Sequence, residues 1–173
     1  SFITIGKMLG IFSILLSLLA SFIYVFNKGK YKNLQSSFLI IAFLSIPVTI
    51  FHAVNGMDTG LHMLLITLVS IFFLESVDQK KYLNYFFITT LFSVLVRYDS
   101  ILFTAPLFLF LFYKHEKNRS QFITNSLIYL IGPGILYFVW KFYYFGNIFP
   151  NSFFVKTSET LISENGLKYL IKN

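Results

Sequence analysis

The sequence has 173 residues, of which 56% are hydrophobic and only 12% are charged. A soluble domain of this length buries only about two-thirds of its surface, so this composition would leave large apolar patches in water and excludes an ordinary water-soluble domain. The formal net charge of +7 lies in short clusters between apolar runs; nucleic-acid binding, which requires a basic face or stripe, is therefore excluded as well.

In chain order, six apolar runs predict an all-α, polytopic bundle of about six transmembrane helices. They cover residues 8–26, 34–54, 60–77, 82–96, 101–113 and 122–145. A helix rises 1.5 Å per residue, so the fourth and fifth runs reach only about 20 to 23 Å, less than the bilayer core requires. The joint between them is therefore predicted to lie below the membrane surface or in a protein cavity. In the sixth run, Gly132-Pro133-Gly134 predicts a kink.

The helical runs predict two regions. Residues 1–150 form the transmembrane region, and residues 151–173 form an extracytoplasmic segment that leads to a further helix. The sequence begins without an initiator Met or a signal-peptide pattern, and its last residues do not resemble the end of a folded domain. We expect it to be an internal piece of a longer protein.

The loop charges predict the orientation. Cytoplasmic loops of membrane proteins carry an excess of Lys and Arg. With six alternating passes, one side receives eight basic residues, whereas Arg97 is the only basic residue in the two short joints opposite. The eight are Lys28, Lys30, Lys32, Lys80, Lys81, Lys114, Lys117 and Arg119. The lysine-bearing loops are therefore predicted to be cytoplasmic, and Glu75, near the cytoplasmic end of its helix, is predicted to be solvated.

Outside the lysine-bearing loops, seven ionisable residues lie at the predicted outward helix ends. They are His52, Asp58, His62, Arg97, Asp99, Lys141 and Lys156. A charge near apolar depth costs about 2.5 to 3.5 kcal/mol on insertion scales, so it often marks a site. The alternative is that Arg97 and Asp99 merely pair, or extend to the lipid headgroups. His52 and His62 have no recognised metal-ligand spacing, and the sequence contains no cysteine, so no metal site is predicted.

Three outward segments carry the most specific pattern. The first is Gly56-Met57-Asp58-Thr59-Gly60-Leu61, and the second is Arg97-Tyr98-Asp99-Ser100-Ile101-Leu102. The third runs over residues 143–156 and reads Tyr-Tyr-Phe-Gly-Asn-Ile-Phe-Pro-Asn-Ser-Phe-Phe-Val-Lys. In order and separation these segments resemble the GT-C class of integral-membrane glycosyltransferases, in particular bacterial members similar to the mycobacterial terminal arabinofuranosyltransferases. Met57-Asp58 stands where that family has Leu-Glu, and Tyr98-Asp99 where it has Pro-Glu.

The resemblance implies an enzyme of the bacterial inner membrane. Such an enzyme transfers a sugar from a polyprenyl-phosphate donor to a glycan, lipid or protein acceptor of the cell envelope, at the outer face of the membrane. The principal catalytic carboxylate of the family lies in the first outward loop, upstream of this sequence. The chain is therefore expected to supply a substrate-binding wall and to be inactive alone. A need for a divalent metal is left open.

The residues predicted to form that wall are Asp58, Arg97, Asp99, Tyr144, Asn147, Asn151 and Lys156. Arg97 can bind a phosphate through two hydrogen bonds, and Lys156 can bind it as a point charge. Tyr144, Asn147 and Asn151 can form hydrogen bonds with sugar hydroxyls. Either aspartate can orient Arg97 or accept a hydrogen bond from a sugar hydroxyl. For Asn147 and Asn151 the alternative is a turn around Pro150.

Two other classes of protein remain open from the sequence. In a transporter or lipid flippase, Asp58, Arg97 and Asp99 would line a substrate path through discontinuous helices. In a purely structural membrane subunit, the outward charges would tolerate substitution.

Overall fold

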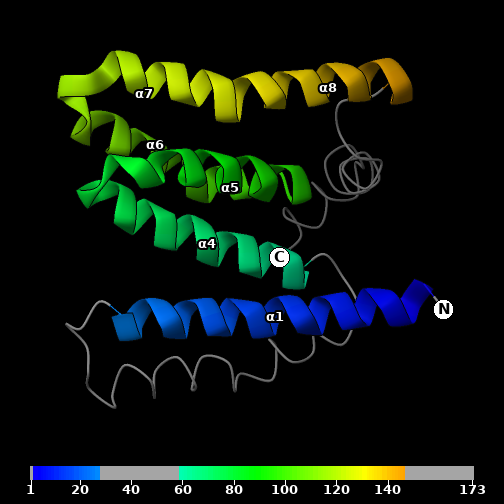
Figure 1. Ribbon diagram of the computed structural model, residues 1–173. Helices are drawn as coiled ribbons and strands as arrows, with labels where there is room; N and C mark the ends of the chain where they lie inside the picture. Colours follow the sequence, from blue (N-terminus) through cyan, green and yellow to red (C-terminus); the bar gives the residue numbers. More distant parts are fainter. Residues whose placement is uncertain (1, 28–58, 147–173) are drawn as a thin grey trace, which may run out of the picture. The chain divides into compact units, whose positions relative to one another are not determined.

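The computed structural model describes residues 2–27 and 59–146, and the predicted all-α class is confirmed for these ranges, which contain helices and no strand (Figure 1). The elements are α1 (Phe2–Asn27), α4 (Thr59–Asp78), the 3-10 turn η1 (Lys80–Tyr82), α5 (Leu83–Val96), α6 (Ser100–Lys114), the 3-10 turn η2 (Glu116–Asn118), α7 (Arg119–Ser126), the π-helical turn η3 (Leu127–Ile131) and α8 (Gly132–Phe145). The chain divides into two compact units after Pro133. The predicted boundary between residues 150 and 151 lies outside the described residues.

Three helices are long and apolar enough to cross a membrane, namely Thr4–Asn27, Thr59–Asp78 and Arg119–Phe145. They correspond to the first, third and sixth predicted spans. The second predicted span, residues 34–54, lies outside the described residues. α5 and α6 form where the fourth and fifth spans were predicted, but they contain only 14 and 15 residues. A six-pass topology is therefore not confirmed.

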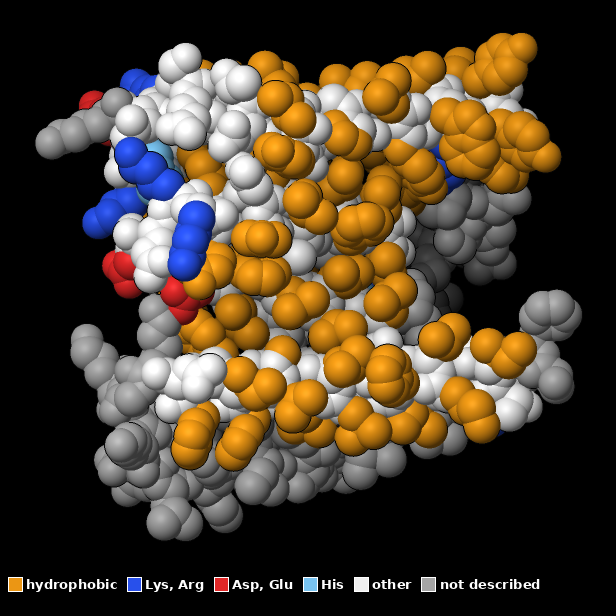
Figure 2. Space-filling model, viewed as in Figure 1, with side chains coloured by type: hydrophobic (Ala, Val, Ile, Leu, Met, Phe, Trp, Pro, Cys, Tyr) orange, Lys and Arg blue, Asp and Glu red, His pale blue; other side chains and the backbone are white. Residues whose placement is uncertain are grey.

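Large apolar side chains are exposed along the helices. On α1 they include Leu9, Phe12 and Leu15, and on α6 they include Leu102 and Phe103. Figure 2 shows such side chains, in orange, along the described helices. A surface this apolar would associate or aggregate in water, whereas it matches lipid. Together with the three long apolar helices, it indicates a membrane protein.

α1 and α4 approach each other closely because small residues line their contact. A Cβ atom added to Gly60 would lie 2.7 Å from the carbonyl oxygen of Gly10. Farther along, the hydroxyl oxygens of Ser17 and Thr67 are 2.7 Å apart and share a hydrogen bond. Small residues allow helix backbones to pack closely in membranes. The GxxxG spacing of Gly6 and Gly10 is the sequence signal for such a contact.

An aromatic core joins the end of α4, the start of α5, the end of α6 and α7. Phe122 of α7 lies at its centre, and its ring meets those of Phe87 and Phe108 edge-on with centroids 5.2 Å apart in both cases. Each such pair contributes about 0.5 to 1.5 kcal/mol beyond burial. The buried apolar residues of the core are Val69, Leu83, Phe86, Phe87, Leu111 and Phe122. The core fixes these helix ends relative to one another.

The predicted break at Gly132-Pro133-Gly134 is marked by the π-helical turn η3. The N–H of Gly132 donates to the carbonyl oxygen of Leu127, five residues earlier. A Cβ atom on Gly132 would lie 2.6 Å from that oxygen, so only glycine fits this turn. Pro133 follows without an N–H to donate. The widened turn therefore occurs where the regular hydrogen-bond ladder cannot continue.

Candidate functional site

The joint between α5 and α6 is a tight turn over residues 97–99. Arg97 has an extended backbone (φ −144°, ψ 120°), which ends α5. Its N–H donates to the carbonyl oxygen of Ser93 at 3.0 Å, and the N–H of Ser100 donates to the carbonyl oxygen of Arg97 at 3.1 Å. These bonds satisfy backbone groups that helix ends otherwise leave unpaired. The turn therefore holds the side chains of residues 97, 99 and 100 in a defined arrangement.

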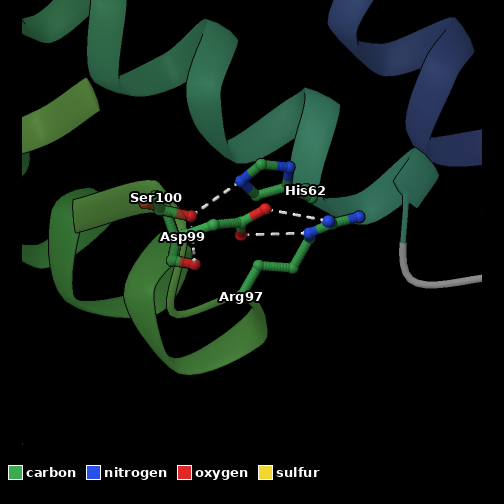
Figure 3. Close-up of polar contacts among 5 residues, drawn as sticks. His62, Arg97, Asp99 and Ser100 are labelled. Atoms are coloured by element: carbon green, nitrogen blue, oxygen red, sulfur yellow. Dashed lines mark hydrogen bonds and ion pairs between the residues drawn. The ribbon is translucent and has the colours of Figure 1, made fainter. Parts of the chain in front are cut away.

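Arg97 and Asp99 form a bidentate ion pair on this turn (Figure 3). Nε of Arg97 donates to Oδ1 of Asp99 at 3.2 Å, and Nη2 donates to Oδ2 at 2.8 Å. Asp99 makes no side-chain cap at the start of α6, although aspartate often caps a helix there, because its carboxylate faces the guanidinium instead. The two side chains are 36% and 55% exposed. The pair is therefore accessible from outside the bundle.

The surroundings keep Asp99 ionised. Its hydrogen bonds from Arg97 are the largest influence and hold its pKa below the ordinary value of 3.8. Partial desolvation opposes this shift, and the charges of Arg97 and His62 add to it. Asp99 is therefore a carboxylate at neutral pH.

His62, near the start of α4, is linked to the turn through Ser100 (Figure 3). Nε2 of His62 lies 2.7 Å from Oγ of Ser100, and that Oγ donates to the carbonyl oxygen of Ser93 at 2.9 Å. A serine hydroxyl has one hydrogen to donate, and a carbonyl only accepts. Because Ser100 uses its hydrogen on Ser93, His62 donates from Nε2. That ring nitrogen therefore carries a proton.

Small hydroxyl side chains are buried behind this turn. Thr90 and Ser93 of α5 and Ser100 and Thr104 of α6 are each at most 3% exposed. The side-chain oxygens of Thr90 and Ser93 have no hydrogen-bond partner in the described part of the chain. An unpaired buried hydroxyl costs about 1 to 3 kcal/mol, and ordered water often satisfies such groups. The interior next to the turn is therefore polar.

The structure brings two of the predicted site residues together, Arg97 and Asp99. Tyr144 lies on α8 in the second unit, 71% exposed, and its ring stacks on that of Trp140 with centroids 5.8 Å apart. The other four predicted residues, Asp58, Asn147, Asn151 and Lys156, lie outside the described residues. Convergence of the three outward segments on one pocket stays a prediction.

The burial of Glu75 differs from what the sequence predicted. It was predicted to be solvated at its helix end, but it is only 9% exposed. It lines an open groove of about 410 Å³ between the end of α1 and α4, together with Tyr24, Phe72 and Tyr82. The expectation of a solvated side chain was wrong, because the hydropathy of α4 alone does not show how other parts of the chain pack against that helix.

Sequence reasoning gave no role to the link between His62 and Ser100. The two residues are 38 positions apart, so no local spacing predicts their contact. The available signal was the position of both residues in the first turn of an apolar helix. Among the residues that the structure describes, no group of three or more His, Cys, Asp or Glu side chains is placed to hold a metal ion.

Comparisons with models of known protein families, with curated proteins and with solved structures find no match. The class of the chain therefore follows from its own fold and site. It is an all-helical chain with three helices able to span a membrane. It carries a charged, hydrogen-bonded turn between two shorter helices.

Proposed function

We propose that this chain is part of a GT-C-like membrane glycosyltransferase, which transfers a sugar from a polyprenyl-phosphate donor to a cell-envelope acceptor. In this proposal the protein is a six-pass protein of a bacterial inner membrane. The lysine-bearing loops face the cytoplasm, and the turn at residues 97–99 faces the extracytoplasmic side. The resemblance of three outward segments to that class motivates the proposal, and the geometry of the turn supports it.

The supporting observation is the placement of the Arg97 guanidinium. A planar guanidinium binds phosphate through two parallel N–H···O bonds, as it binds a carboxylate. The bidentate contact with Asp99 fixes its orientation while leaving the side chain 36% exposed. An oriented cation at the end of two short helices suits the phosphate of a lipid-linked sugar. It would stabilise the negative charge that develops on the leaving phosphate.

The neighbours of Arg97 have supporting roles in this proposal. Asp99 keeps the guanidinium in place through both of its oxygens. His62 and Ser100 tie the start of α4 to the start of α6, and so fix the turn against the bundle. The base that activates the acceptor hydroxyl is expected from the upstream segment that the resemblance implies. Asp58, Tyr144, Asn147, Asn151 and Lys156 are proposed to bind sugar and phosphate around the same site.

The test compares two arginine–carboxylate ion pairs in the full-length protein. Arg97→Ala should lower transfer about 100-fold or more, the effect of losing one oriented donor in an active site. Arg119→Ala is the matched control, because Arg119 lies 3.9 Å from Glu116 and is 46% exposed. It should change transfer by less than about twofold, since an exposed pair of this kind contributes little. Membrane insertion of both variants is checked by fractionation.

An exchange of the two charges makes the test sharper. Arg97→Asp combined with Asp99→Arg keeps the net charge and allows an ion pair, but it moves the cation by two residues. If the cation binds phosphate, the double variant stays inactive. Recovery of transfer would show that the pair is only structural and would refute the proposed role of Arg97.

A transporter or lipid flippase is the second candidate, and one observation favours it. Thr90 and Ser93 place two hydroxyls without partners, within the described residues, inside the bundle beside the turn. Pro106 lies inside α6 and has no N–H to donate to the preceding turn of the helix. Polar groups inside an apolar helical bundle suit a substrate path. Reconstituted protein that moves a labelled lipid across vesicles without forming a glycosidic bond would support this candidate over the enzyme.

A further inference from the structure

Basic side chains gather at the end of the first unit opposite the turn at residues 97–99. On the face shown in Figure 2, Lys and Arg side chains, with some Asp and Glu side chains among them, mark the end where α4 ends and α7 begins, and the apolar surface stops there. Lys80, Lys81, Lys114 and Arg119 belong to these helix ends. If the apolar surface lies in hydrocarbon, this layer lies at the level of the lipid headgroups.

A small polar pocket opens within this layer. Its volume is about 20 Å³, which is roughly the space that one water molecule or one phosphate oxygen occupies. The lining residues are Lys80, Leu83, His115, Asn118, Gln121, Phe122 and Asn125. Most of these carry polar side chains, whereas the aromatic core directly beneath the pocket is apolar.

The inner wall of the pocket is fixed by contacts of its own. Nε2 of His115 lies 3.0 Å from the carbonyl oxygen of Ser76, so this nitrogen carries a proton and donates it. The His115 ring also stacks on that of Phe122, with centroids 6.3 Å apart. Nδ2 of Asn125 donates to Oδ1 of Asn84 at 2.8 Å. The wall is therefore preorganised.

The mouth of the pocket is different. Within the described residues, no side-chain hydrogen bond or ion pair engages Lys80, Asn118 or Gln121. Together they present one ammonium group and two amide groups, all of which can donate hydrogen bonds. The nearby carboxylate of Glu116 is 77% exposed and lies 3.9 Å from Arg119. The mouth therefore offers donors and positive charge to a ligand.

We propose that this pocket binds the phosphodiester group of an anionic phospholipid. One phosphate oxygen enters the pocket and accepts hydrogen bonds from the amides of Asn118 and Gln121. Lys80 supplies the charge, and charge-assisted hydrogen bonds of this kind are the strong ones. The acyl chains lie along the exposed apolar surface of the helices. A zwitterionic lipid binds more weakly, because its own cation meets the surrounding lysines.

The experiment uses adjacent lysines as a matched pair. Lys80 lines the pocket, whereas the ammonium group of Lys81 lies over the Tyr82 ring, 4.8 Å from its centroid. The full-length protein in nonionic detergent is titrated with phosphatidylglycerol, phosphatidylcholine or inorganic phosphate, and the rise in melting temperature gives the affinity. We expect phosphatidylglycerol to bind the unchanged protein best. Lys80→Gln should weaken that binding roughly tenfold and Lys81→Gln less than about twofold.

A third variant keeps the lysines and changes the mouth of the pocket. Gln121→Glu places a negative charge beside the bound phosphate and should weaken phosphatidylglycerol binding at least as much as Lys80→Gln. Equal losses in Lys80→Gln and Lys81→Gln would overturn the proposal, because the attraction would then be that of a diffuse basic surface. Equal stabilisation by inorganic phosphate and phosphatidylglycerol would overturn the assignment to a lipid. Neither result depends on whether the protein transfers sugars.

Discussion

The two ends of the α4–α5–α6 bundle contain the same kinds of charged residue in different settings. At one end, Arg97 and Asp99 form a bidentate pair at 2.8 and 3.2 Å, next to buried hydroxyl groups. At the other end, Arg119 and Glu116 approach only to 3.9 Å and are more exposed. The guanidinium carbon of Arg119 instead lies 5.1 Å from the centre of the Phe112 ring.

The difference indicates that one end of the bundle mainly stabilises the fold and that the other end carries the candidate site. The end with Arg119 rests on the aromatic core, where apolar burial and ring contacts stabilise the fold. The end with Arg97 buries small hydroxyl side chains, and its helices are joined by hydrogen bonds through His62, Ser93 and Ser100. Polar groups near apolar depth are costly and usually functional. Substitutions in the aromatic core should therefore affect stability, and those at the turn should affect activity.

The largest effect expected on stability is that of Phe122→Ala. This side chain is 1% exposed and contacts several rings of the core. Its loss leaves a cavity and should lower the free energy of unfolding by about 3 to 5 kcal/mol. Phe92→Ala is the control, because Phe92 is 52% exposed, and it should cost far less. Thermal unfolding in detergent measures both. Similar losses for the two variants would show that the aromatic core does not hold the bundle together.

The next effect concerns the contact between α1 and α4. Gly60→Ala places a Cβ atom 2.7 Å from the backbone of Gly10, and the helices must separate to accept it, at a cost of about 1 to 3 kcal/mol. Gly146→Ala is the matched change, because that glycine has open space around it and a φ of +70°. It should cost only the local backbone strain, about 1 kcal/mol. Measurement of both by thermal unfolding should rank Gly60→Ala as the more harmful. The reverse order would argue against close packing of α1 on α4.

The sequence predicted the helices well where hydropathy decides them. The runs at 8–26, 60–77 and 122–145 correspond to helices able to span a membrane. A long apolar run with few charges is stable as a helix in the hydrocarbon core of a bilayer. The two short helices were located correctly, and the turn at residues 97–99 follows from their lengths. The number of passes was not confirmed, since length and composition alone do not establish that α5 and α6 cross a membrane.

Side-chain partners between helices were harder to predict. Arg97 and Asp99 are two residues apart, so their pairing was a foreseeable local contact. The bond between His62 and Ser100 depends on how α4 packs against the joint of α5 and α6, and no spacing in the sequence encodes that. Burial of Glu75 likewise depends on the approach of α1 to α4. Periodicity and hydropathy describe one helix at a time, whereas these contacts depend on pairs of helices.

The smallest expected effect is the contribution of Asp99 to stability as the pH changes. Its pKa in the folded protein is held below the ordinary 3.8, chiefly by hydrogen bonds from Arg97. A carboxyl group with a lowered pKa stabilises the fold above its ordinary pKa, and that stabilisation is lost as the pH falls through the lowered value.

The comparison of the unchanged protein with Asp99→Asn measures this contribution. The melting temperature of the unchanged protein should exceed that of Asp99→Asn by a small, constant margin from neutral pH down to about 3.8, and the margin should close at lower pH. The margin is small because the side chain is 55% exposed, and solvent screens exposed ion pairs. Glu116→Gln, at the other end of the bundle, should show a smaller margin or none. A margin for Asp99→Asn that persists unchanged in strong acid would mean that the carboxylate charge is not what Arg97 stabilises.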